Sequence, residues 1–81
     1  MEFQKGLVVR ATAGRDRGSF FVVLEISSRF ALISDGKHRP LEKPKKKALI
    51  HLSAVSVILP DSSMKTNREI RKALHSFEGA C

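Results

Sequence analysis

Short apolar runs, several with alternating polar positions, occupy most of the first sixty residues and predict β-strands. Five such runs are expected to form strands, over residues 7–12, 19–26, 30–34, 48–52 and 55–59. In the first run, the alternation predicts that Leu7, Val9 and Ala11 face inward. In the second, which has the strongest strand pattern, it places Phe20 on the inward face and Phe21 on the opposite face. The pattern therefore predicts a small antiparallel sheet.

Turn-forming residues separate these runs. Gly14 and Gly18 bracket three charged residues, so residues 13–18 are predicted to form an exposed loop. The Asp-Gly pair at residues 35–36 favours a tight turn after the third strand. Two prolines within residues 37–46 remove backbone donors and discourage a helix. This stretch is interpreted as an extended surface loop with its lysines in solvent.

A helical pattern follows the strands. Residues 66–69, Thr-Asn-Arg-Glu, match a capping box, in which the threonine hydroxyl and the glutamate carboxylate satisfy free backbone N–H groups. Apolar residues then recur at helical spacing and would bury one face: Ile70, Ala73, Leu74 and Phe77. The opposite, wet face carries Arg68, Arg71, Lys72 and His75. Gly79 is expected to end the helix.

This order of elements predicts a mainly β fold, an SH3-like five-stranded small barrel with a short C-terminal α-helix. A barrel suits an antiparallel sheet because it leaves few strand edges unpaired. Residues 1–60 are assigned to the barrel and residues 61–81 to the helix, packed on or beside it. At 81 residues, the whole chain is expected to form a single domain.

Positive charge is the strongest signal in the composition. Fifteen Lys and Arg residues against eight Asp and Glu residues give a formal net charge of +7. Residues 37–47 alone hold six basic residues and one acid, a net charge of +5. A polyanionic partner is the first explanation of such clustering. A basic loop that is only solvated is the alternative.

The sequence offers little for catalysis or for a cofactor. Its one cysteine is Cys81, so it predicts no intrachain disulfide and no thiolate pair for zinc. The three histidines are far apart, and neither a nucleophile elbow nor a phosphate-binding P-loop is found. We expect no enzymatic activity, no cofactor, no metal and no small-molecule substrate. No apolar run is long enough to cross a bilayer and no secretory signal is recognised, so a cytoplasmic protein without a membrane partner is expected.

The first two predicted strands and their loop resemble a KOW motif, the element shared by several ribosomal proteins and transcription elongation factors. Gly18 matches the signature glycine of that motif. Residues 35–40 and 44–47, followed by Ile-His-Leu at 50–52, resemble small KOW proteins related to the archaeal and eukaryotic large-subunit ribosomal protein fourteen-e family. The resemblance covers residues 3–60, and the helix start at residues 65–70 is also similar to compact bacterial members of that group, so nearly the whole chain is expected to belong to it. The resemblance implies an SH3-like fold that binds structured RNA, expected to be ribosomal RNA or the large ribosomal subunit, with no enzymatic role.

Basic side chains of the two predicted loops and the helix are the candidate RNA contacts. They are Arg15, Arg17, Lys37, Arg39, Lys43, Lys45, Lys46, Lys47, Arg68 and Lys72. The first two can grip a phosphate bidentately, whereas lysines act as mobile point charges. Asp16 is expected either to orient one of the arginines beside it or only to form the turn. On the helix, a solvated outer face is an equal alternative to RNA contact.

The chain has neither Trp nor Tyr, and most of its five Phe residues are expected in the core. Recognition of the shape and backbone of folded RNA is therefore favoured over base stacking. Phe21 is the exception: packing against the helix is the preferred interpretation, and stacking on a base is the alternative. We expect a monomer. Two other functions stay open, an SH3-like adaptor for proteins and a transcription-elongation-type KOW module.

Overall fold

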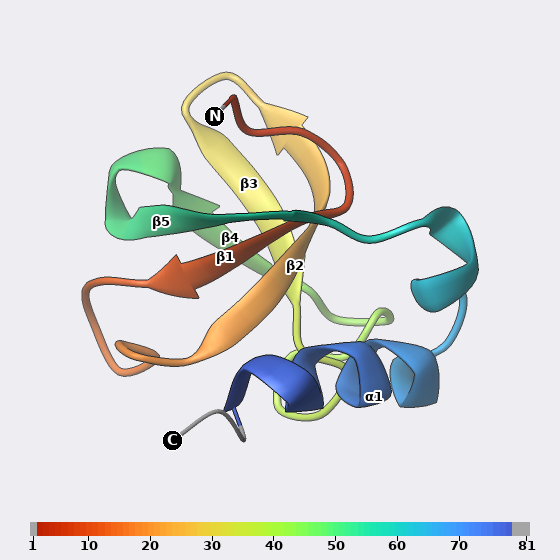
Figure 1. Cartoon of the computed structure of the whole chain (residues 1–81). Coiled ribbons are helices and arrows are strands. Elements are labelled where there is room, and N and C mark those ends of the chain that lie inside the picture. Colours follow the sequence, from red (N-terminus) through yellow and green to blue (C-terminus); the bar gives the residue numbers. More distant parts are fainter. Residues whose placement is uncertain (1, 79–81) are drawn as a thin grey trace.

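Five strands precede one α-helix in the computed structural model, which describes residues 2–78 (Figure 1). The elements are β1 (Leu7–Ala11), β2 (Phe20–Ser27), β3 (Phe30–Ser34), β4 (Lys45–Ala48), the 3-10 turn η1 (Leu49–His51), β5 (Leu52–Ile58), the 3-10 turn η2 (Asp61–Ser63) and the helix α1 (Asn67–Glu78). All strand pairs are antiparallel, in the order β4-β3-β2-β1-β5. This confirms a mainly β fold with one short C-terminal helix. The sheet is not closed, because β4 and β5 form its two edges.

The last two strands differ from those expected. The strands predicted at 48–52 and 55–59 are found at Lys45–Ala48 and Leu52–Ile58, with η1 between them. The apolar run at 48–52 therefore turns, and the lysine run expected in a loop forms β4 instead. Strand pairing uses the backbone, so Lys45, Lys46 and Lys47 pair with Ile33, Leu32 and Ala31 of β3 whatever their charge. Lysine is well suited to such an edge because its charge discourages pairing with another chain.

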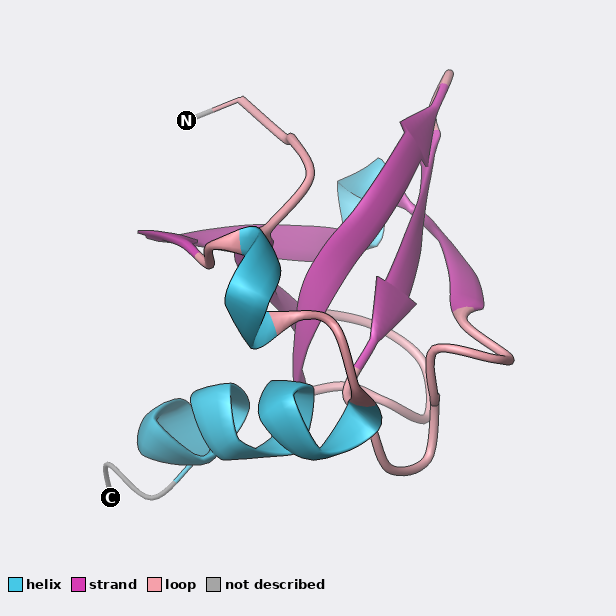
Figure 2. Ribbon diagram, turned by 90° about the vertical axis from the view of Figure 1, so that its right-hand side faces the viewer, coloured by secondary structure: helices cyan, strands magenta, loops and turns pink. Residues whose placement is uncertain are grey.

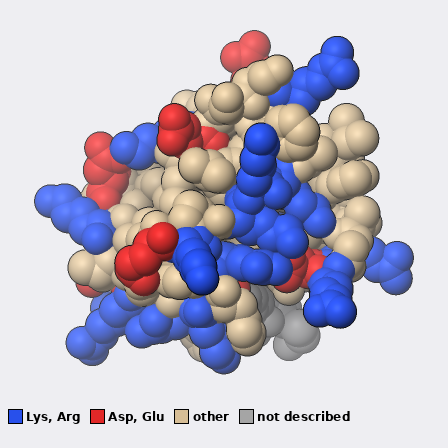
Figure 3. Space-filling view, turned by 180° about the vertical axis from the view of Figure 1, so that it is seen from behind, with Lys and Arg blue, Asp and Glu red and all other residues tan. Residues whose placement is uncertain are grey.

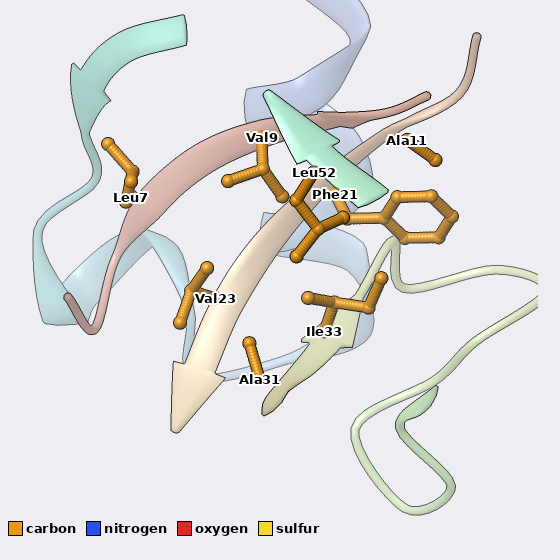
Figure 4. Close-up of a cluster of buried hydrophobic side chains, with 8 residues drawn as sticks. All are labelled: Leu7, Val9, Ala11, Phe21, Val23, Ala31, Ile33 and Leu52. Atoms are coloured by element: carbon orange, nitrogen blue, oxygen red, sulfur yellow. The ribbon is translucent and has the colours of Figure 1, made fainter. Parts of the chain in front are cut away.

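Apolar side chains form two cores, one on each face of the sheet. The first, drawn in Figure 4, contains Leu7, Val9, Ala11, Phe21, Val23, Ala31, Ile33 and Leu52. The second lies between the other face and the C-terminal segment and contains Val8, Val22, Met64, Ile70 and Leu74. The inward positions predicted for β1 are confirmed, but Val8 between them is equally buried. Because β1 and β2 are covered on both faces, a simple alternation of inside and outside does not describe them.

The two neighbouring phenylalanines of β2 occupy the faces opposite to those predicted. Phe20 packs toward α1, where its ring centroid lies 5.9 Å from that of Phe77. Phe21 points into the first core, away from the helix, and is 1% exposed. Packing of Phe21 against the helix and its use for base stacking are therefore both wrong. Both positions are apolar, so the sequence could not tell which face the helix would cover.

The helix lies across one side of the sheet (Figure 2), and the threonine half of the predicted capping box is present at its start. The backbone N–H of Glu69 donates to Thr66 Oγ1 at 3.1 Å. Ile70 and Leu74 are buried in the second core, which confirms the predicted apolar face. The end predicted at Gly79 lies outside the described residues. No helix within residues 2–78 combines the length and the apolar character that crossing a membrane requires.

Replacing Thr66 with Ala is expected to lower the free energy of unfolding by about 1 kcal/mol, because the N–H of Glu69 loses its acceptor. In a domain of this size, that corresponds to a melting temperature lower by roughly 4–8 °C. Thermal unfolding followed by circular dichroism measures the change. Thr66→Ser keeps the hydroxyl and should melt like the parent. Equal melting of the Ala variant and the parent would show that the cap contributes nothing.

Candidate functional site

The loop between β1 and β2 holds its basic side chains in solvent. Gly14 and Gly18 both have positive φ, +81° and +90°, which glycine adopts without strain. Backbone bonds close the loop: the N–H of Arg17 donates to the carbonyl of Gly14 at 3.2 Å, and that of Gly18 to Ala11 at 2.8 Å. Arg15 and Arg17 are exposed. The loop is thus a compact turn that presents two guanidinium groups.

The segment after β3 is equally ordered. The Asp35 carboxylate accepts the backbone N–H groups of Lys37 at 2.9 Å and Arg39 at 2.8 Å. The buried Ser34 hydroxyl donates to the carbonyl of Arg39 at 2.7 Å and accepts the N–H of Gly36 at 3.1 Å. These four bonds fix the turn at residues 34–39. The stretch predicted as an extended loop is therefore a structured turn before β4.

These two segments meet on one surface. Asp16 Oδ2 lies 3.5 Å from Arg39 Nη2 and 3.7 Å from Lys45 Nζ. Lys47 Nζ donates to the carbonyl oxygen of Ala13 at 3.0 Å. Positions about 30 residues apart in the chain are thereby brought together. We call the five cations around Asp16 the basic cluster: Arg15, Arg17, Arg39, Lys45 and Lys47.

Asp16 lies in the turn, as one of the two predicted alternatives has it, but its side chain makes ion pairs that were not predicted. Its ion pairs in the described part of the chain join Arg39 and Lys45, not the arginines on either side of it in the sequence. The carboxylate is 18% exposed and lies between like charges that would otherwise repel one another. Arg39 Nε is buried and has no hydrogen-bond partner among residues 2–78. Asp16 thus holds two cations of the cluster in place, and one of them, Arg39, keeps a buried donor without a partner in the described part of the chain.

Lys46 lies on the opposite side of β4 from the two lysines of the cluster, as strand alternation requires. Its Nζ lies 4.5 Å from the ring centroid of Phe30, within the range of a cation–π contact. The Phe30 ring is 40% exposed. The sequence interpretation missed this ring because it assigned most phenylalanines to the core. Its position at the first residue of a strand, directly after a tight turn, was the available signal.

Figure 3 shows where positive side chains gather on the face that lies at the back of Figure 1. A group of Lys and Arg side chains occupies the middle of this face, in the region of β4, with an acidic side chain beside it. Further cations stand apart at its rim. Positive charge is therefore concentrated at one place on this face as well as scattered around it.

The remaining predicted residues lie outside the basic cluster. Lys37 and Lys43 are exposed on the segment between β3 and β4, and Arg68 and Lys72 are exposed on α1. No ion pair or hydrogen bond between residues 2–78 joins these four to the cluster. Contacts in the structure thus bring Arg39, Lys45 and Lys47 onto the loop that carries two further predicted residues, Arg15 and Arg17. Lys46 lies within β4, on the side of the strand opposite to Lys45 and Lys47.

Two cations that the prediction left out take part in this region. Arg71 Nη1 of α1 donates to the carbonyl oxygen of Gly36 at 2.7 Å and so ties the helix to the turn after β3. The guanidinium of Arg10, exposed on β1, lies beside Gly18. The sequence placed Arg71 on the wet face of the helix but gave no sign of its partner. Within residues 2–78, no group of three or more His, Cys, Asp or Glu side chains is placed to hold a metal ion.

Comparisons with known proteins do not assign this chain to a family. No protein-family model matches the chain, and no curated protein matches it either. The resemblance to KOW proteins therefore remains an expectation from the residues that carry it.

Proposed function

We propose that this chain is a non-catalytic RNA-binding protein whose basic cluster contacts the phosphates of a structured RNA, expected to be ribosomal. One observation carries the proposal: the segment that runs into β4 meets the loop after β1, which presents Arg15 and Arg17. At this meeting point Arg39 and Lys45 pair with Asp16, and Lys47 donates to the loop backbone. An excess of fixed positive charge of this kind attracts a polyanion. The cluster is held by ordered backbone on both sides, so its charges are positioned before any partner arrives.

The chemistry of the cluster suits the RNA backbone. Arg15 and Arg17 are exposed and can each present a planar fork to a phosphate. Arg39, Lys45 and Lys47 are half-buried, so less side-chain entropy is lost when they bind. The chain lacks Trp and Tyr, which favours contact with the backbone and shape of RNA over stacking on its bases.

The fold included in this proposal is the SH3-like barrel of KOW proteins. It is supported by the antiparallel order β4-β3-β2-β1-β5 and by η1, which joins the two edge strands through only three residues. The N–H of Thr12 at the end of β1 donates to the carbonyl of His51 in η1 at 2.8 Å. This bond extends the pairing of β1 with β5 into η1, the turn at which the two edge strands are joined. A cytoplasmic, ribosome-associated location belongs to the same proposal.

The salt dependence of binding tests the proposed function. Each phosphate neutralised changes log K by at least about 0.7 per decade of salt, the value for a single strand, so five contacts predict a slope of about −3.5 or steeper. Filter binding of ribosomal RNA between about 0.05 and 0.5 M salt measures this slope. Sedimentation with ribosomal particles should show association at low salt that high salt removes.

A slope near zero, or no association with RNA at low salt, would contradict the proposal. Partners that stay bound after nuclease treatment would instead favour the protein adaptor. Competition by duplex DNA as strong as by ribosomal RNA would reject RNA as the specific ligand.

A further inference from the structure

A polar cleft lies between α1 and the turn after β3, apart from the ion pairs of the basic cluster. Its volume is about 350 Å³. Polar side chains from three elements line it: Ser19, Asp35, Lys37, His38, Arg71 and His75. Residues from the start of β2, the turn and the helix therefore converge on one recess, and four of them carry N–H donors that can face an anion.

We propose that this cleft binds the phosphate group of a nucleotide and gives the protein a second anchoring point on its RNA. The inference rests on the proposed function. It adds a defined recess for one phosphate to the charged surface formed by the basic cluster. Lys37 and Arg71 supply two fixed positive charges against the single negative charge of Asp35. His75 adds a ring N–H even when it is neutral, and His38 adds one when its Nδ1 does not donate to Asp35. Phosphate, with strong acceptor oxygens on all sides, matches such a set of donors.

The acid in the cleft is already engaged. Asp35 Oδ1 accepts two backbone N–H groups of its own turn, and Oδ2 lies 3.8 Å from His38 Nδ1. Its side chain is 15% exposed. Because its carboxylate already accepts two backbone N–H groups, Asp35 repels an incoming anion less than a free carboxylate would. Arg71 gives one N–H to Gly36, and a guanidinium has five, so it keeps donors for a ligand.

The cleft is held open by rigid walls. Gly36 has φ +73° and packs so tightly on the first turn of α1 that a Cβ there would overlap the carbonyl oxygen of Asn67. Asn67 in turn accepts the backbone N–H of Leu41 at 2.7 Å and donates to Glu42 at 2.7 Å. Helix and turn are therefore locked together. A preformed site loses less entropy on binding than a flexible one.

The size of the cleft limits what can enter. Its volume is near the lower end of the range found for small-molecule sites, about 300–1,000 Å³. A single nucleotide with its phosphate fits such a space, whereas a helical segment of RNA does not. The RNA would therefore present either a terminal phosphate or a nucleotide that is turned out of its strand.

NMR titration of the full ¹⁵N-labelled chain tests the proposal. Inorganic phosphate and adenosine 5′-monophosphate, added separately, are expected to shift the amide signals of Lys37, His38 and His75. The double variant K37Q/H75Q should weaken both affinities at least fivefold. Both side chains are exposed, so the variant should melt like the parent. The matched control K5Q/K65Q alters two residues beside η2 and should leave the affinities unchanged.

Two short RNAs, one with a 5′-phosphate and one with a 5′-hydroxyl, then separate the sources of the phosphate. Cleft shifts with the first alone indicate a terminal phosphate, and shifts with both indicate an internal one. Phosphate that moves only the signals of the basic cluster, or no signals, overturns the cleft and leaves the proposed function standing. Cleft binding of phosphate without any binding of ribosomal RNA would reject the proposed function and the RNA-anchoring role, and would leave the cleft as a phosphate site.

Discussion

Replacing Gly36 with Ala is expected to destabilise the domain by about 3 kcal/mol, a large part of the roughly 4–12 kcal/mol that a chain of this length has. Two effects add. The residue has φ +73°, a left-handed conformation that costs a residue with a Cβ about 1–2 kcal/mol. The new Cβ would also overlap the backbone oxygen of Asn67, which cannot move without shifting the start of α1. The melting temperature should fall by at least about 12 °C.

Gly14→Ala is the matched control, because Gly14 has a similar φ of +81° but a different neighbour. A Cβ there would meet only Lys47 Nζ, at 3.0 Å, and that flexible side chain can move aside. This variant should lose only the conformational part, about 1 kcal/mol. Thermal and urea unfolding of both variants provide the comparison. Equal losses at the two sites would contradict the tight contact between the turn and the helix.

Local sequence patterns predicted the first three strands and the start of the helix. The first three strands follow β-branched runs bounded by turn residues, and they appear within two residues of their expected bounds. The helix start at residue 67 follows from a hydroxyl three positions before Glu69. Such features depend on neighbours in the chain, so the sequence contains what is needed to recognise them.

The strand formed by Lys45–Ala48 could not be predicted in the same way. Its residues have no apolar alternation, and it exists because β3 offers an unpaired edge to its backbone. Tertiary pairing here overrides local propensity. The exchange of faces between Phe20 and Phe21 has a related cause, since both faces of β2 are covered and only the position of α1 separates them.

Only some features of the candidate site could be predicted, because contacts between distant segments are not visible in the local sequence. A charge count finds the lysine run and the loop arginines, but it contains no information on which segments meet. The pairing of Asp16 with Arg39 and Lys45 joins residues 23 and 29 positions apart. The contact between Arg71 and Gly36 spans 35 positions. Only the folded chain reveals that Asp16 organises a cluster and that the helix closes a cleft.

Replacing Lys45 and Lys47 with Gln is expected to weaken binding of ribosomal RNA about 25-fold at 0.1 M salt. Two phosphate contacts are lost. Each contributes about 0.7 log units to the binding constant for every tenfold reduction in salt below a 1 M reference, and about 0.1 M salt is one such reduction. Glutamine keeps most of the side-chain length, so packing along β4 is largely preserved. The contacts to Asp16 and Ala13 change as well, so thermal unfolding must show that the variant is folded.

The matched control K5Q/K65Q removes the same two charges from a different place. These lysines line a separate cleft beside η2, which lies at the right of Figure 1, whereas the loop after β1 lies at the left. Overall charge alone would weaken both variants equally. A defined interface would weaken only the variant in the basic cluster.

Filter binding of ribosomal RNA by these two folded variants at several salt concentrations tests the role of the basic cluster most directly. The predicted result is a 25-fold loss for K45Q/K47Q at about 0.1 M salt, a log-log slope shallower by about 1.4, and less than about a threefold loss for K5Q/K65Q. Equal losses and equal slopes for the two variants would contradict RNA contact through the surface around Asp16.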